Sequence, residues 1–214
     1  MNNKQILEAL ELVRKESKKR NFNQSIDLSI SLRDVNLKDP NKRFRAEVLL
    51  PHVINDSIKI CAIGDADVIA RAKAAGIFAT LDEVEVENFG KNLRGLKAFV
   101  EEIDYFLAIP QMMAAVGRFL GRVLGPAGKM PTILPPNADL SNFITRYSRT
   151  CRIRLRQNPV IHCKVASEDM ENDAIVENVR TVLNEVENRL DQGAQNIRKA
   201  HIKTTMGPAV IIGA

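Results

Sequence analysis

The sequence has 214 residues, of which 45% are apolar and 27% are charged, and its net charge is +5. These proportions are typical of a globular protein, and the length allows one large domain or two modest ones. The absence of any run of eighteen apolar residues excludes a membrane-spanning helix. The charged N-terminus excludes a signal peptide. Three widely spaced cysteines, Cys61, Cys151 and Cys163, predict reduced thiols in a cytoplasmic protein.

The first elements are expected to be one helix and two half-buried strands. Residues 3–20 place apolar side chains at helical spacing, which predicts an amphipathic helix. Residues 25–32 and 44–50 alternate strictly between apolar and polar side chains, which predicts strands with one face in a core and one face in water. Pro51 ends the second strand.

From Lys59 onward the pattern changes to apolar strands that alternate with helices. The expected elements are a strand at 58–64, a helix at 65–76, a strand at 77–80, a helix at 93–102, a strand at 104–109 and a helix at 111–125. This alternation predicts a parallel sheet covered by helices, which is an α/β fold.

After residue 150 the half-buried pattern returns. The expected elements are strands at 151–156 and 160–166, a helix at 171–190, and strands at 201–206 and 209–213. Neither end of the chain has enough strands for a stable sheet by itself. We therefore expect an α+β domain I built from both ends, residues 1–53 plus 158–214, and an α/β domain II inserted between them, residues 54–157.

The charge is unevenly distributed along the chain. Between Tyr105 and Ser167 the one acid is Asp139, against nine bases, so this stretch carries +8. The bases are Arg118, Arg122, Lys129, Arg146, Arg149, Arg152, Arg154, Arg156 and Lys164. Such segregation favours a polyanionic partner, and the alternative is a solvated basic face. With no Trp and few other aromatic residues, the chain suits structured RNA better than stacked single strands.

The stretch GRVLGPAGKMP, residues 121–131, resembles a phosphate-binding loop but lacks its chemistry. Met130 stands where such a loop needs Ser or Thr after Gly128-Lys129. The dinucleotide fingerprint is also missing, because Gly64 is followed by an acidic segment with no further glycine. No clustered metal ligands or nucleophile motif occur, so we expect no cofactor, no metal and no catalysis. A nucleotide-binding α/β enzyme is kept as the alternative.

The stretch HIKTTMGP, residues 201–208, offers hydroxyls, a thioether and a glycine beside a lysine. Hydroxyls bond phosphate oxygens and ribose 2′-OH groups, and a glycine lets a backbone approach the sugar edge. The alternative is a plain hairpin turn, since Gly-Pro is common in turns.

Three motifs occur in the order seen in one known family: NFNQSIDL followed by LLPH, then GRVLGPAGKMP, then TTMGP. In these motifs the chain resembles the ribosomal protein L-one family of the large subunit, in its archaeal branch, over essentially the whole length. The resemblance implies a split β-α-β-type domain with an inserted Rossmann-like, three-layer α/β domain. It also implies a monomer when free, located in the cytoplasm on the ribosome.

The resemblance further implies that the chain binds large-subunit ribosomal RNA and forms the mobile stalk near the tRNA exit site. It implies a second use as a repressor that binds its own messenger RNA, with tRNA as a further candidate partner. The RNA-binding residues that we predict are Arg20, Phe22, Ser25, Asp27, Lys164, Lys203, Thr204, Thr205, Met206 and Gly207. Asp27 stands where many relatives have Glu. Asn21 stands where some relatives have a Lys that would contact a phosphate, and Arg20 would supply that charge instead.

A secondary basic surface is also predicted, formed by Arg122 and Lys129 in the loop 121–131 and by Arg152, Arg154 and Arg156 in the strand that follows. Its expected role is salt-sensitive binding of other RNA or of tRNA.

Overall fold

The computed structural model describes residues 2–39, 42–55, 57–135 and 138–213. The chain divides into a terminal unit, Met1–Asp56 with Ser148–Ala214, and an inserted unit, Ser57–Tyr147. Residues 148–157 therefore belong to the terminal unit and not to the inserted one, in contrast to the expected boundary. The reason is that the strand Thr150–Leu155 pairs along its whole length with Phe44–Leu49. Within the described residues, no helix combines the length and the apolar character needed to cross a bilayer.

The terminal unit contains two helices, six strands and a short 3₁₀ turn among its described residues. They are α1 (Asn3–Glu16), β1 (Ser25–Leu32), β2 (Phe44–Leu49), β7 (Thr150–Leu155), β8 (Val160–Ser167), α8 (Asn172–Arg189), η3 (Gly193–Asn196), β9 (Ile197–Thr204) and β10 (Val210–Ile211). Four strands form an antiparallel sheet in the order β10-β9-β1-β8, while β2 and β7 form a separate antiparallel pair.

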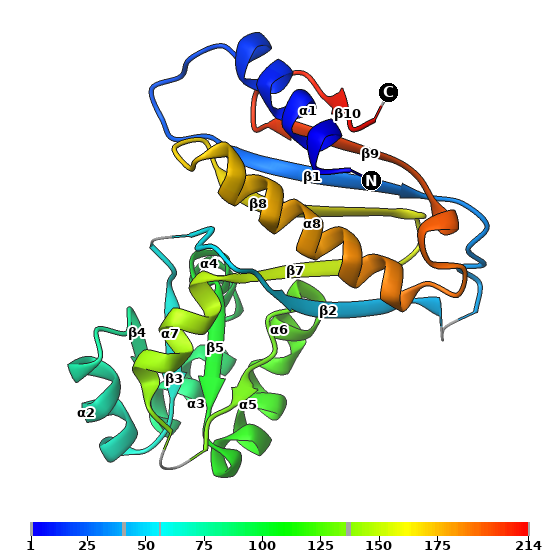
Figure 1. The fold of residues 1–214 in the computed structure, drawn as a ribbon. Helices are drawn as coiled ribbons and strands as arrows, with labels where there is room; N and C mark the ends of the chain where they lie inside the picture. Colours follow the sequence, from blue (N-terminus) through cyan, green and yellow to red (C-terminus); the bar gives the residue numbers. More distant parts are fainter. Residues whose placement is uncertain (1, 40–41, 56, 136–137, 214) are drawn as a thin grey trace. The chain divides into compact units, whose positions relative to one another are not determined.

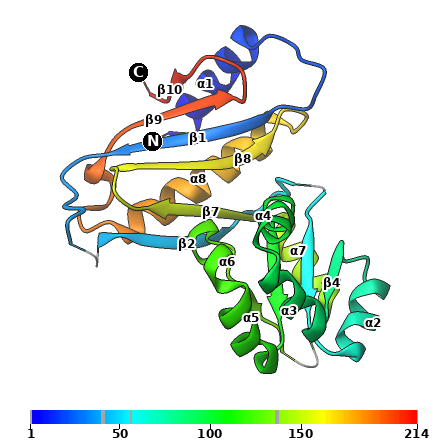
Figure 2. The ribbon, with the colours of Figure 1, turned by 180° about the vertical axis from the view of Figure 1, so that it is seen from behind.

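Both helices of the terminal unit cover the same face of the four-stranded sheet. Figure 1 shows α1 and α8 in front of the strands, and Figure 2 shows the opposite face, which these two helices leave uncovered. The sequence causes this arrangement, because Ile26, Leu28 and Ile30 alternate with polar residues along β1 and are fully buried. Apolar residues of α8, among them Ile175, Val179 and Val186, are buried in the same core, which Ala46 and Ile153 of the β2-β7 pair also join.

The inserted unit is an α/β fold with a parallel sheet. Its elements are β3 (Ile60–Ile63), α2 (Ala66–Ala74), β4 (Ala79–Leu81), α3 (Glu83–Lys91), α4 (Leu93–Glu102), β5 (Tyr105–Ala108), η2 (Pro110–Met112), α5 (Met113–Phe119), α6 (Gly121–Ala127), β6 (Thr132–Ile133) and α7 (Leu140–Ser148). All neighbouring strands run parallel in the order β4-β3-β5-β6. This order places the second strand of the unit outside the first, as in doubly wound nucleotide-binding folds.

Two neighbouring residues of β5 show that helices cover both faces of this sheet. Tyr105 stacks on Tyr147 of α7, with ring centroids 4.1 Å apart. The ring of Phe106 meets the edge of Phe99 in α4, with centroids 6.2 Å apart. Because consecutive side chains of a strand point to opposite faces, α7 and α4 lie on opposite sides of the sheet. The unit therefore has three layers.

The inserted unit also departs from the sequence predictions in three places. Helices α3 and α7 and the short strand β6 were not predicted. The helix predicted at 111–125 is divided at Leu120 into α5 and α6. Finally, most of the predicted loop 121–131 is helical, because α6 continues through Pro126 and ends at Gly128, whose φ of 71° is left-handed. Pro126 lies beyond the first turn of α6, so the helix lacks one backbone hydrogen bond at this position, and it ends one residue later at Ala127.

Candidate nucleic-acid interface

A buried network of polar side chains fixes the turn that follows β9. The Thr204 hydroxyl lies 2.9 Å from the Ser17 hydroxyl, and both Thr204 and Gln24 are fully buried. The Gln24 amide donates to the Ser17 hydroxyl at 3.3 Å and accepts the Met206 backbone N–H at 3.1 Å. Buried polar groups that are satisfied in this way specify one geometry for the turn. Thr204 was predicted to contact RNA, but its burial gives it this positioning role instead.

Beyond the network, Thr205 is held against the start of β1. Its backbone N–H donates to the Ser25 carbonyl at 3.0 Å, while its hydroxyl accepts the Ser25 backbone N–H at 3.0 Å. The two hydroxyls of Thr205 and Ser25 are also 3.0 Å apart. Residues 180 positions apart thus form one cluster, and Thr205 is exposed to solvent.

Gly207 has a steric reason to be glycine. A Cβ added at this position would lie 2.3 Å from the Thr204 hydroxyl, which is closer than real Cβ contacts. The backbone N–H of Gly207 also donates to the Thr204 carbonyl at 3.2 Å. The glycine therefore lets the turn close over the buried network and leaves its backbone near the surface.

Two large apolar side chains are exposed beside this cluster. Met206 is 59% exposed and Phe22, in the segment that leads to Gln24, is 52% exposed. Arg20, in the same segment, is exposed as well. We call Phe22, Ser25, Thr205, Met206 and Gly207 the Met206 patch. It combines apolar contact area, hydroxyls and accessible main chain, all on a fixed scaffold.

Next to the Met206 patch, charged residues form a row across the sheet. Asp27 of β1 stands opposite Lys164 of β8 on one side and Lys203 of β9 on the other. The Asp27 carboxylate also accepts a hydrogen bond from the Ser25 hydroxyl at 3.4 Å. The structure thus brings together the predicted residues Ser25, Asp27, Lys164, Lys203 and Thr205, which the sequence supplies from three separate segments.

The predicted secondary basic surface is divided between the two units. Arg152, Arg154 and Arg156 lie on or directly after β7 in the terminal unit. Arg152 donates to the Glu47 carboxylate at 3.2 Å, and Arg154 stands opposite Arg45 in the strand pair. Partial burial and then the positive charges of Arg156, Arg45 and Arg152 lower the pKa of Arg154. An anion bound at this cluster would relieve that repulsion.

The other two members of the predicted secondary surface lie in the inserted unit, and only one is placed to bind a partner. Arg122 is exposed on α6. The Lys129 ammonium instead donates to the carbonyls of Val100 at 2.7 Å and Ile103 at 2.5 Å, at the end of α4. Lys129 therefore caps that helix, where a positive charge is also favoured by the helix dipole.

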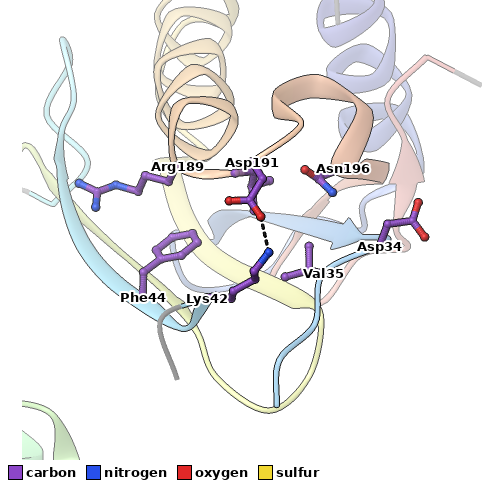
Figure 3. Close-up of a pocket in the computed structure, with 8 residues that line it drawn as sticks. Asp34, Val35, Lys42, Phe44, Arg189, Asp191 and Asn196 are labelled. Atoms are coloured by element: carbon purple, nitrogen blue, oxygen red, sulfur yellow. Dashed lines mark hydrogen bonds and ion pairs between the residues drawn. The ribbon is translucent and has the colours of Figure 1, made fainter. Parts of the chain in front are cut away.

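A small cavity of about 260 Å³ lies at another edge of the terminal unit. In Figure 3 the Lys42 ammonium points at the Asp191 carboxylate, with which it forms an ion pair, and Phe44 lies beside them. The hydrogen bond to Asp191 raises the pKa of Lys42. The guanidinium of Arg189 lies 5.9 Å from the centroid of the Phe44 ring. Lys42 is paired with Asp191 and Arg189 with Glu185, and the volume of the cavity is below that of ordinary ligand sites.

The turn where a Rossmann-type fold would hold a dinucleotide has the wrong chemistry for one. Gly64 follows β3, but Asp65 precedes α2 and Asp67 lies in the first turn of that helix. Two carboxylates there would repel a pyrophosphate. Gly64 is needed for packing, since an added Cβ would lie 2.9 Å from Val68. In the described part of the chain, no group of three or more His, Cys, Asp or Glu residues could hold a metal ion.

The chain thus combines a split α+β unit with an inserted α/β unit. Similarity to known proteins then shows the family to which the chain belongs. Residues 13–208 match the model of the Ribosomal protein L1p/L10e family. The chain is 38% identical over 206 residues to the large ribosomal subunit protein uL1 of Methanobrevibacter smithii, covering 96% of this chain and 97% of that protein. The chain is also 38% identical to the large ribosomal subunit protein uL1 of Thermococcus kodakarensis, and the match covers 96% of this chain and 95% of that protein.

A third relative, uL1 of Methanocaldococcus jannaschii, is 36% identical over 210 residues, covering 98% of this chain and 95% of that protein. The chain therefore belongs to the ribosomal protein L1p/L10e family and is of the archaeal type. This family is structural and not enzymatic, so the nucleotide-binding enzyme that the inserted unit suggested is excluded.

Proposed function

We propose that this chain is a component of the large ribosomal subunit that binds large-subunit ribosomal RNA through the Met206 patch and the adjoining row of Asp27, Lys164 and Lys203. As a ribosomal protein it is associated with the ribosome in the cytoplasm. The relatives in Methanobrevibacter smithii and Thermococcus kodakarensis are named as proteins of the large subunit, which supports this assignment.

The observation that carries the proposal is the exposed turn at Thr205 and Met206, held by the buried side chains of Gln24 and Thr204 and the partly buried Ser17. A fixed surface loses little conformational entropy on binding and can match a prefolded RNA shape. Hydroxyls and main-chain groups bond the ribose 2′-OH and phosphate, and Met206 packs on a sugar or base face. Lys164 and Lys203 add attraction that does not depend on sequence.

The experiment is a filter-binding titration of in vitro transcribed large-subunit ribosomal RNA at moderate salt. Met206→Asp places a negative charge in the patch and is expected to weaken specific binding by at least about 30-fold, the size of an interface hot spot. Leu12→Asp is the matched control, because Leu12 is also exposed, at 47%, but lies on α1. If both variants bind like the wild type, the Met206 patch is not the RNA site.

The same patch supports a second use, as a repressor that binds its own messenger RNA. A surface that recognises an RNA fold binds any transcript that presents the same fold. In a competition titration, the chain's own transcript should displace ribosomal RNA from the wild type, and Met206→Asp should lose both ligands together. Loss of one without the other would show two separate sites.

The remaining part of the proposal concerns the mobile stalk near the tRNA exit site. Arg122, exposed on the inserted unit, supports a contact to tRNA that is independent of the Met206 patch. Arg122→Gln should then reduce tRNA binding and leave ribosomal RNA binding unchanged. The chain is proposed to be a monomer when free, which light scattering of the purified protein tests.

A further inference from the structure

The uncovered face of the terminal-unit sheet carries an ordered pattern of polar side chains beyond the Met206 patch. Figure 2 looks onto this face, with β9, β1 and β8 side by side. Two residues along from Asp27, Ser29 of β1 stands opposite His162 of β8 and opposite His201 of β9. A Lys-Asp-Lys row is thus followed by a His-Ser-His row on the same face, since alternate residues of a strand share a face.

Two hollows on this face share His162. One has a volume of about 590 Å³ and is lined by Asp27, Ser29, His162, Cys163, Lys164, His201, Lys203 and Ala209. The other has a volume of about 420 Å³ and is lined by Arg154, Arg156, Gln157, Asn158, Val160 and His162. His162 borders both hollows, so they adjoin each other on this face, and we call the two together the open-face trough.

The charge of the open-face trough fits a polyanion. Its permanent cations are Lys164, Lys203, Arg154 and Arg156, and Asp27 is the one carboxylate among its described lining residues. No aromatic ring other than the two imidazoles lines the described trough, so it offers no platform for stacking bases on Phe or Tyr. Such a surface suits the ribose-phosphate backbone of RNA rather than its bases.

We infer that the open-face trough is a second part of the RNA-binding surface, in which phosphates bind beside His162 and His201 and binding adds protons to the two imidazoles. The inference rests on the proposed function, because it requires that the chain binds RNA. It adds Ser29, His162 and His201 to the proposed RNA-binding surface. It also makes Arg154 and Arg156, which were predicted to form a secondary basic surface, part of the same RNA-binding surface.

The proton linkage follows from the surroundings of the two imidazoles. His162 is exposed and His201 is partly exposed, so a phosphate can approach both. Around them lie Lys164, Lys203, Arg154 and Arg156, with Lys199 one row further along β9 and Asp27 one row toward the Met206 patch. On the remaining side, β10 places uncharged Ile211 opposite His201. A phosphate beside an imidazole favours its charged form, and histidine is the side chain that titrates near neutral pH.

The test measures RNA affinity at pH 8.0 and pH 6.0 at constant ionic strength, with the ribosomal RNA transcript described above. The wild type is expected to bind about tenfold more tightly at pH 6.0, because each proton taken up on binding can strengthen it by up to tenfold per pH unit. The double variant H162Q/H201Q is expected to bind equally at both pH values. Since the RNA is the same, its own protonation cancels in this comparison.

His52→Gln is the matched control, because His52 pairs with Glu177 at 2.7 Å and lies outside the trough. This variant should keep the full pH dependence, and thermal unfolding checks that all variants are folded. The inference would be overturned if the RNA affinity of the wild type did not depend on pH, or if that of the double variant did. Tight RNA binding at both pH values would in that case leave the proposed function standing. Absence of RNA binding at either pH would overturn the proposed function itself.

Discussion

The hydroxyl oxygen of Thr205 lies 3.0 Å from the Ser25 backbone nitrogen and 3.0 Å from the Ser25 hydroxyl, so it joins the two ends of the chain at one point. The N-terminal strand β1 and the C-terminal strand β9 pair directly, which makes this contact possible. The proposed RNA site therefore depends on the long-range pairing of the terminal unit and is absent from either end alone.

Gly207→Ala is expected to destabilise the terminal unit by about 1–3 kcal/mol, the usual cost of overpacking, because the new Cβ collides with the Thr204 hydroxyl. The RNA affinity of this variant should also fall, because the turn that carries Thr205 and Met206 must move to accommodate the new Cβ. Denaturant unfolding followed by circular dichroism measures the change. Gly117→Ala is the control: nothing lies within 4 Å of its added Cβ, and it sits in helix α5. It should be neutral or stabilising, and an equal loss from both variants would contradict the steric argument.

Arg156→Gln is expected to change the salt dependence of RNA binding more than Arg152→Gln does. Removing one lysine or arginine that binds a phosphate reduces the slope of log K against log salt by about 0.7 to 0.9. Arg156 is exposed, whereas Arg152 already pairs with Glu47. Titrations between low and moderate salt measure both slopes. Equal slopes in the wild type and in Arg156→Gln would make Arg156 a solvated side chain that does not bind RNA.

Lys129→Met is expected to destabilise the inserted unit by about 1–3 kcal/mol, because it leaves carbonyls at the end of α4 without their charged donor. Tyrosine fluorescence reports this unit selectively, since the chain has two tyrosines and no tryptophan, and Tyr105 and Tyr147 both lie there. Arg122→Met, at an exposed position, should change stability by less than about 0.5 kcal/mol. If Lys129→Met lowered the RNA salt slope without loss of stability, the capping role would be wrong.

The three thiols are expected to be unreactive toward a disulfide reagent at pH 8, because all are buried. Burial raises the pKa of Cys61 to about 12, and the hydrogen bond with Cys151 followed by burial raises the pKa of Cys163. A raised pKa keeps the thiol protonated at pH 8, and the thiolate is the reactive form. All three should react once the chain is unfolded. Rapid reaction of one thiol in the folded protein would contradict this packing.

Much of the fold follows from local sequence patterns. Strict alternation predicted β1, β2, β7 and β8, and helical spacing predicted α8, because each pattern puts one apolar face into a shared core. Helix α3 was missed because Val86 is its one buried residue, whereas α7 was missed although it buries two residues, Leu140 and Tyr147, as many as the predicted α4. The assignment of β7 to the terminal unit depends on its pairing with β2, which no local pattern contains.

The site was predicted only in part, for a related reason. The sequence indicated which residue types gather near the C-terminus, but Thr204 and Thr205 cannot be told apart by composition. Strand register decides that Thr204 faces the core and Thr205 faces outward. Gln24 was missed because a buried amide has no sequence signature of its own. Its position directly before the alternating strand β1, within the NFNQSIDL motif, was the available signal.

The most direct test of the central claim is an NMR titration of protein labelled with ¹³C at its methionine methyl groups. The chain has six methionines, of which Met206 is 59% exposed in the patch and Met130 is 43% exposed in the inserted unit. On addition of a ribosomal RNA fragment at equimolar ratio, we expect the Met206 methyl signal to shift, while that of buried Met112 stays in place. A spectrum in which Met130 shifts and Met206 does not would contradict the account, because the RNA would then bind the inserted unit and not the turn where the two chain ends meet.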